Sequence, residues 1–329
     1  MTQVLATTAG LYPLPDWAKD DLAELKGHQR SDLIDGTEGE EIISTYDRAR
    51  EEVIDAQQDA GLDRIVEGQL RWDDMIAHPL SVHDAVETRG IVRYYDNNNF
   101  YREPVVEGEL TPDGDVGAEL DAAAGLVDDG LQAVLPGPYS LSELATDEYY
   151  GDEAAFLDAI AEFLAAETEA FPEVETLFLL EPSLVTEPPA DGGERASEAI
   201  DTVATAIDAE VVVQTYWGAL EEKVYAYVLD AGIDAVGYDL VSDHEQAIHN
   251  ANEYGTTDDV ALGLVDGQNT LVETPAEIRE RIEWFLEQTT NDVETVYATP
   301  NTELFYLPVN KFEAKLESLA EAATEEVDA

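Results

Sequence analysis

The fold of this chain is decided by three stretches: residues 211–218 read VVVQTYWG, residues 235–241 read AVGYDLV, and residues 260–269 read VALGLVDGQN. Each stretch starts with a short apolar run and ends in polar or aromatic residues. Continuous apolar runs of this length are typical of parallel strands that are buried on both faces. The three stretches therefore predict strands of one buried parallel sheet, with polar side chains at their carboxyl ends.

The same pattern recurs in both directions along the chain. Eight strand candidates lie at residues 4–8, 64–70, 131–135, 177–181, 211–215, 235–239, 260–264 and 295–299. Helix-like segments at residues 41–60, 153–169, 194–208, 220–231, 243–252, 275–288 and 311–325 follow most of them. Eight alternating strand–helix units predict an α/β fold, a (βα)8 TIM barrel, in which residues 1–329 form one domain.

One region departs from this alternation. Residues 91–110 are rich in aromatic and β-branched residues, and Asn97–Asn99 is a turn candidate. We interpret the region as a β-hairpin excursion in an early βα loop, although it could instead supply a strand of the barrel.

The composition is strongly acidic. Asp and Glu number 74 against 16 Lys and Arg, which gives a formal net charge of −58. Such a field repels nucleic acid and anionic membrane surfaces, so we expect neither as a partner. The chain is also 44% hydrophobic, which argues against disorder. The charge indicates a halophilic protein whose self-repulsion is screened by salt, and circular dichroism should show loss of structure at low salt.

Several kinds of site and segment are not indicated by the sequence. The absence of cysteine excludes disulfides and thiolate ligands. His244 and His249 are five residues apart and so do not form a metal-binding i, i+4 pair. No apolar run reaches the roughly 20 residues of a membrane helix, and no secretory signal is evident at the N-terminus. We expect a cytoplasmic protein.

Ligands of such barrels bind at the carboxyl ends of the strands. The residues expected to line a polar pocket there are Trp72, Asp73, Glu181, Gln214, Tyr216, Trp217, Asp239 and Asn301. Trp72, Tyr216 and Trp217 would form its walls. Each polar residue could instead cap a helix or solvate a loop. Glu181 and Asp239 could act as a carboxylate pair in proton transfer or cation binding, or each could pair with an arginine.

These strand ends carry a family resemblance that extends over nearly the whole chain. The motifs are at residues 56–63 and 67–73, at 135–138, 180–184 and 300–304, and most specifically at 215–218, 238–241 and 263–269. In order and spacing the chain resembles cobalamin-independent methionine synthase, a two-barrel enzyme that transfers a methyl group from methyltetrahydrofolate to homocysteine. The most specific motifs are similar to those of its N-terminal barrel, not to its catalytic C-terminal barrel.

The resemblance also shows what this chain lacks. The family's catalytic barrel holds zinc with His, Cys and Glu, and the corresponding residues here are Gln214, Tyr216, Asp239 and Thr302. Amide, phenol and hydroxyl groups are poor ligands for a thiophilic ion, so no tightly bound metal or other cofactor is expected on this chain. The family's basic cluster after the first strand is reduced to Lys19, with Lys26 beyond it, which makes capture of a polyglutamate tail doubtful.

The resemblance therefore implies methionine biosynthesis by one barrel of a split methionine synthase. The partner would be a separate zinc-bearing barrel, and the small-molecule substrates would be homocysteine and a folate-type methyl donor or a related one. Two alternatives are a stand-alone methyltransferase with a different donor and a non-catalytic barrel that binds pterin or homocysteine. A decarboxylase-like relative of the same superfamily is less favoured, because only Arg71, Arg93 and Arg102 could hold substrate carboxylates.

Overall fold

A computed structural model of the chain describes residues 2–22, 39–72, 76–94, 99–190 and 193–324. Eight strands form one sheet in the order β1-β11-β10-β9-β8-β7-β5-β2. Their bounds are β1 Gln3–Ala6, β2 Ile65–Val66, β5 Leu131–Pro136, β7 Thr176–Leu180, β8 Glu210–Gln214, β9 Ala235–Asp239, β10 Asp259–Val265 and β11 Thr295–Pro300. Every neighbouring pair in the sheet is parallel. Each strand overlaps one of the eight segments predicted from the sequence.

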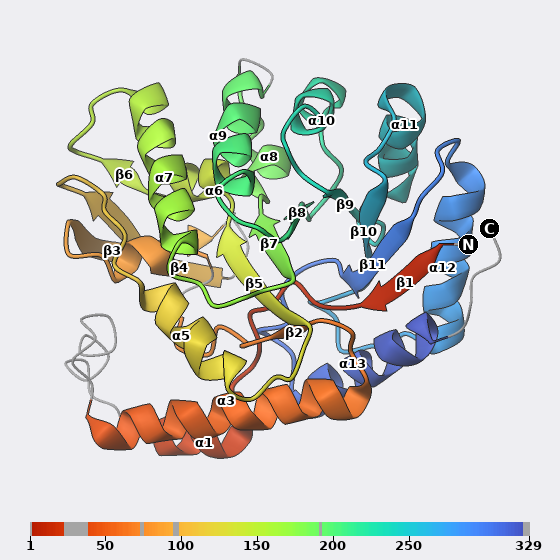
Figure 1. Ribbon diagram of the computed structural model, residues 1–329, viewed down its shortest axis with the longest axis horizontal. Helices are drawn as coiled ribbons and strands as arrows, with labels where there is room; N and C mark the ends of the chain where they lie inside the picture. The colour runs from red at the N-terminus through yellow and green to blue at the C-terminus, as the bar shows by residue number, and fades with distance from the viewer. Residues whose placement is uncertain (1, 23–38, 73–75, 95–98, 191–192, 325–329) are drawn as a thin grey trace.

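The sheet curls so that its two edge strands, β1 and β2, approach each other (Figure 1). The amides of Asp63 and Arg64 donate to the carbonyl oxygen of Ala6, at 2.9 and 3.3 Å. In return, the amide of Ala6 donates to the Asp63 carboxylate at 2.7 Å. These bonds connect the edges where no regular ladder is formed. The predicted α/β fold is therefore confirmed, and the curled eight-stranded parallel sheet is consistent with a TIM-barrel-like arrangement.

Helices surround the curled sheet (Figure 1). The longer ones are α3 Glu40–Ala60, α5 Asp115–Ala124, α7 Glu153–Thr168, α9 Glu194–Ala204, α11 His244–Tyr254, α12 Pro275–Gln288 and α13 Val309–Ala323. The shorter ones are α1 Asp16–Leu22, α4 His78–Ser81, α6 Pro138–Leu144, α8 Ser183–Thr186 and α10 Glu222–Val228. Local chemistry sets their ends: α3 stops at Gly61, whose φ of 86° suits glycine, and α12 starts with a Thr274–Glu277 capping box.

The region predicted to form a hairpin lies in two strands outside the main sheet, β3 Val86–Tyr94 and β4 Asn99–Val106. These strands pair antiparallel, with an irregularity between Thr88 and Ile91, and β4 also pairs with the short strand β6 Thr146–Asp147. They lie between β2 and β5 in the chain, but in the main sheet β2 pairs directly with β5, so neither is a strand of that sheet. The predicted turn at Asn97–Asn99 falls mostly outside the described residues.

The core lies inside the sheet and between the sheet and its helices. Leu177, Phe178, Leu179 and Leu180 of β7 are all fully buried, and Phe178 makes an edge-on ring contact with Tyr297 of β11. Burying one such side chain contributes about 1.5–3 kcal/mol. A strand buried on both faces explains why the sequence reads as a continuous apolar run.

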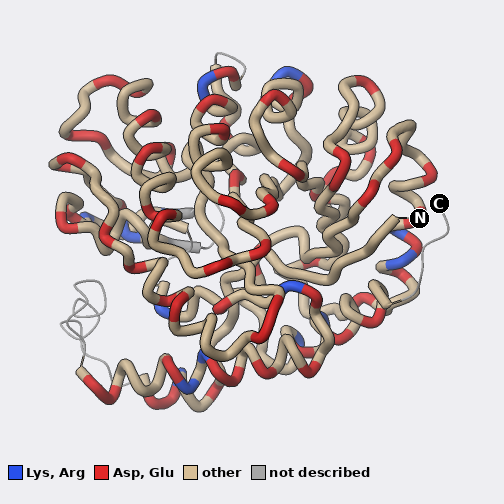
Figure 2. The backbone as a smooth tube through the Cα atoms, in the orientation of Figure 1, with Lys and Arg blue, Asp and Glu red and all other residues tan. Residues whose placement is uncertain are grey.

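Acidic residues are spread over the outer helices and the loops that connect them (Figure 2), and a few others are buried at the strand ends. Several of the few basic residues pair with glutamate: Arg50 and Arg71 with Glu119, Arg64 with Glu175, and Arg89 with Glu148. In the part of the chain that the structure describes, no helix is both long and apolar enough to cross a membrane.

Candidate functional site at the carboxyl ends of the strands

Strained backbone marks the loops that follow the strands. Among the residues that the structure describes, three that are not glycine have positive φ: Leu11 at 56°, Gln69 at 51° and Trp217 at 70°. They follow β1, β2 and β8, at the same end of the sheet. The Gln69 side chain accepts from the Leu11 amide at 2.8 Å, which joins the first two loops. Because strain of this kind collects at functional sites, the three residues point to this end of the barrel.

Glu181 immediately follows β7 and is completely buried. Its carboxylate accepts hydrogen bonds from the amides of Tyr139 and Ser140, at 3.0 and 2.7 Å, and from the Ser140 hydroxyl at 2.6 Å. A Cβ atom on Gly137 would lie 2.1 Å from this carboxyl group, so only glycine fits there. Burial raises the pKa of Glu181 to about 7, although its three donors favour the ionised form. Glu181 therefore holds the start of α6 against the strand end.

Asp239, at the end of β9, is the centre of a larger network. It accepts from the amides of Trp217, Val241 and Ser242 at 2.8, 3.0 and 2.9 Å. The Asn301 amide group donates to both of its oxygens, at 3.1 and 3.2 Å. Burial raises the pKa of Asp239, and these donors oppose the shift. One carboxylate thus links the loops after β8 and β9 to the end of β11.

Asn301 and Lys315 extend this network to the loop after β10. The Asn301 side-chain oxygen accepts from the amide of Gly267 at 3.0 Å. Lys315, which is buried on α13, donates to Glu273 at 2.6 Å, and Glu273 accepts from the Asp266 amide at 2.9 Å. The loop after β10 is therefore fixed from both sides.

The structure brings some of the predicted pocket residues together and separates others. Tyr216 and Trp217 contact each other edge to face with ring centroids 4.8 Å apart, and both lie beside the Asp239 network. Gln214 is buried and meets Glu181 through the backbone, where its carbonyl accepts from the Glu181 amide at 2.9 Å. Trp72 instead stacks on His78 at 5.3 Å.

Two further predictions about this face concern Asp73 as a pocket residue and the partners of Glu181 and Asp239. Asp73 lies outside the described residues. For Glu181 and Asp239, among the residues that the structure describes, every hydrogen bond comes from a backbone amide, a hydroxyl or a carboxamide, and neither forms a salt bridge with arginine. Each carboxylate organises its own loops.

The sequence analysis did not single out two buried acids. Glu303 follows β11, and within the described part of the chain neither of its carboxylate oxygens has a partner in hydrogen-bonding geometry. Burial raises its pKa to about 7, and only the nearby Gln268 side chain and its own backbone lower it. Glu67 follows β2, and its pKa is raised to about 8 by burial and by Glu119. The available signal was an acid close to the end of an apolar strand: Glu67 directly follows β2, and Glu303 lies three residues after β11.

The strand ends do not fit the zinc that the family resemblance implies. Gln214 offers an amide oxygen, which has no hydrogen-bond partner among the described residues, and Thr302 offers a hydroxyl that donates to a backbone carbonyl. Both oxygens of Asp239 already accept hydrogen bonds. Thiophilic zinc is held by thiolate and imidazole ligands, so this donor set suits it poorly.

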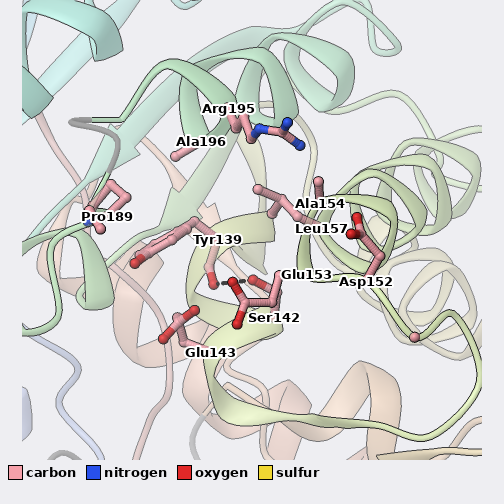
Figure 3. A pocket seen from close by; sticks show the side chains of 12 residues that line it. Tyr139, Ser142, Glu143, Asp152, Glu153, Ala154, Leu157, Pro189, Arg195 and Ala196 are labelled. Carbon is pink, nitrogen blue, oxygen red and sulfur yellow. Dashed lines mark hydrogen bonds between the residues drawn. The ribbon is translucent and has the colours of Figure 1, made fainter.

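A cavity of 770 Å³ opens beside this face (Figure 3). It is lined by α6, the start of α7, the loop before α9 and α9 itself. Its polar side chains are Tyr139, Ser142, Glu143, Asp152, Glu153 and Arg195, and none of the residues predicted to form the pocket is among its lining. Tyr139 connects it to the strand ends, because the Tyr139 amide donates to Glu181.

Comparison with known proteins identifies the family. Residues 82–290 match the model of the family described as cobalamin-independent synthase, N-terminal domain. The chain belongs to the cobalamin-independent methionine synthase family. Members of this family are methyltransferases, and the family resemblance inferred from the motifs is confirmed.

Relatives and solved structures of this family align over almost the whole chain. A methionine synthase of Saccharolobus islandicus is 24% identical over 319 residues, which are 96% of this chain and 92% of that protein. A methionine synthase of Sulfurisphaera tokodaii is 23% identical over 310 residues, 93% and 87% of the two chains. The solved structure of a Shewanella B12-independent methionine synthase in complex with selenomethionine superimposes with a TM-score of 0.79 at 18% identity, covering 97% of this chain and 96% of that one. Single-barrel chains of this length therefore occur in the family.

Proposed function

We propose that this chain takes part in methyl transfer to homocysteine as one barrel of a two-chain methionine synthase, with zinc held by a separate barrel. The observation that carries the proposal is the donor set at the strand ends. Homocysteine must be deprotonated before it attacks a methyl group, and Gln214, Asp239 and Thr302 provide no ligand set that would stabilise a metal-bound thiolate.

The chain's own contribution would be to position the substrates and to exclude water. Asp239 and Asn301 hold three loops in one arrangement, and Trp217, partly exposed at positive φ, presents an aromatic surface beside them. Holding reactants in the productive geometry can lower a barrier by at most ~7–11 kcal/mol without any nucleophile on this chain. The methyl donor would be a folate-type molecule with a short tail or a related pterin.

A second candidate function is a stand-alone methyltransferase. It is favoured by one observation: relatives named methionine synthase align with this chain over nearly their entire length. A non-catalytic barrel that binds pterin or homocysteine is the third alternative.

Methionine formation distinguishes the three functions. The assay contains homocysteine and methyltetrahydrofolate in molar KCl, since we propose that the acidic surface requires salt. Its arms are this chain alone, a zinc-bearing barrel of the same family alone, and both together. We expect methionine at a substantial rate only when both chains are present.

The other outcomes are equally decisive. Methionine formed by this chain alone at the rate of the mixture would overturn the two-chain proposal and support the stand-alone enzyme. No turnover in any arm, together with calorimetric binding of homocysteine or donor, would support the binding barrel.

A pair of tryptophan variants tests the positioning role in the same assay. Trp217→Ala should lower the rate of the two-chain mixture by about tenfold, equivalent to ~1.4 kcal/mol. Trp284→Ala, on the outer helix α12 against His244, is the matched control and should change the rate little. Equal effects of the two variants would count against a site at Trp217.

A further inference from the structure

The cavity beside α6 has an unusual balance of charge. Glu143, Asp152 and Glu153 contribute carboxylates to its lining. In the view of Figure 3, Arg195 on α9 lies on one side of the cavity and Glu143 on α6 lies on the other. A ligand that satisfies both sides needs an anionic group and a cationic group.

Arg195 is the first reason to infer a ligand. Its side chain is exposed, and in the described part of the chain it forms no hydrogen bond or ion pair, although acidic residues outnumber basic ones 74 to 16. By contrast, Arg50, Arg64, Arg71 and Arg89 each pair with a glutamate. A guanidinium group is a planar, bidentate partner for carboxylates, so Arg195 is available to bind one.

The carboxylates on the other side favour a cation. Although the Glu143 side chain is largely exposed, its pKa is raised by partial burial, by the charges of Glu187 and Glu153, and by a hydrogen bond with Glu187. The Asp152 side chain is already engaged, because it accepts from the Ala155 amide at 3.1 Å and caps α7. Glu143 and Glu153 therefore remain to face a positively charged group.

The same charges exclude other classes of ligand. Several carboxylates would repel a phosphate or a polyglutamate tail, and Arg195 would repel a polyamine. No group of three or more His, Asp or Glu among the described residues is arranged to hold a metal ion. Leu157, Ala196 and Pro189 supply the apolar part of the lining.

We propose that this cavity binds a small α-amino acid as its zwitterion, with Arg195 holding the carboxylate and Glu143 and Glu153 facing the ammonium group. The apolar lining suits an uncharged side chain such as a thioether. A volume of 770 Å³ lies within the range of ~300–1,000 Å³ that small-molecule sites occupy. The choice of sulfur amino acids as probes rests on the proposed function, whereas the charge pattern of the site does not.

Isothermal titration calorimetry on the full chain tests the proposal, with L-methionine and L-homocysteine as probes. Two truncated analogues of methionine separate its charged groups: 4-(methylthio)butanoate lacks the amine, and 3-(methylthio)propylamine lacks the carboxylate. We expect both amino acids to bind and each analogue to bind at least about tenfold more weakly. Affinity should increase as the pH rises above the usual carboxyl range, because ionisation of Glu143, whose pKa is raised, strengthens its attraction for the ammonium group.

Variants locate the binding. Arg195→Gln and Glu143→Gln should each weaken methionine binding by about tenfold or more. Lys223→Gln, on the exposed surface of α10, removes one positive charge outside the cavity and should leave binding unchanged. Circular dichroism of each variant checks that it is folded.

Two results would overturn the inference: no binding of either amino acid at millimolar concentration, or binding that Arg195→Gln and Glu143→Gln leave unaltered. Neither result would reject the two-chain proposal, because methionine formation in the mixed assay is measured independently. If the mixed assay formed no methionine while calorimetry still showed amino-acid binding, only the two-chain proposal would be rejected.

Discussion

Replacing Asp239 with alanine is expected to lower the free energy of unfolding by roughly 4 kcal/mol. Asp239 is almost completely buried and accepts from the Trp217, Val241 and Ser242 amides and from the Asn301 side chain. The substitution leaves these donors without an acceptor in a buried position, and each unsatisfied donor costs about 1–3 kcal/mol before water or local movement compensates. Urea unfolding in molar KCl, followed by circular dichroism, measures the loss.

Asp266→Ala provides the matched control, because it removes an acid from the end of the adjacent strand β10. Asp266 is only partly buried, and its carboxylate accepts from the Gln268 amide at 2.9 Å. Its replacement should cost about 1 kcal/mol or less. If the Asp239 and Asp266 variants were equally stable, Asp239 would not be the organising centre of the strand ends.

The second large effect is a gain in stability. Glu303→Gln should stabilise the protein by up to about 3 kcal/mol at pH 8 and have little effect at pH 5. Folding raises the pKa of Glu303 from 4.5 to about 7. The stability that its protonated form contributes is therefore present below about pH 4.5 and is lost as the pH rises through about 7. Glutamine resembles the protonated acid and does not ionise.

Scanning calorimetry at the two pH values measures this effect, and the expected rise in melting temperature at pH 8 is roughly 4–6 °C. Glu277→Gln is the control, and its effect on stability at neutral pH should have the opposite sign. Its backbone and side-chain hydrogen bonds with Thr274 lower the pKa of Glu277, so the stability it contributes is present at neutral pH and lost in acid. A Glu303 variant that is destabilised at pH 8 would show that its carboxylate has a partner in solution.

The strands and the helices with strong signals could be predicted from the sequence. Apolar runs such as residues 211–215 mark strands buried on both faces, and α12 was predicted at its observed bounds, since its capping box and apolar spacing agree. Helix α6 was not predicted. Its first residues follow Pro136 and Gly137, which read as a turn, and its start is held by Glu181, which is more than 40 residues away in the chain.

The candidate site was predicted only in part, because its contacts also join residues that are far apart in the chain. The sequence indicated Asp239 and Asn301 as pocket residues, but their contacts join residues 217, 241, 242 and 267, which no local pattern relates. Trp72, which was expected to form a wall of the pocket, stacks on His78, a contact that no local pattern predicts. The cavity is formed by helices and loops that carry no strand-end signal, so its ligand groups appear only in three dimensions.

We propose that the strand ends of this barrel do not bind the zinc that activates homocysteine. The most direct test of this proposal is the zinc content of the purified chain, measured by elemental analysis after dialysis against a chelator and then against buffer with equimolar zinc. We expect far less than one zinc per chain and an unchanged melting temperature. One zinc retained per chain, and lost in Asp239→Asn, would contradict the proposal.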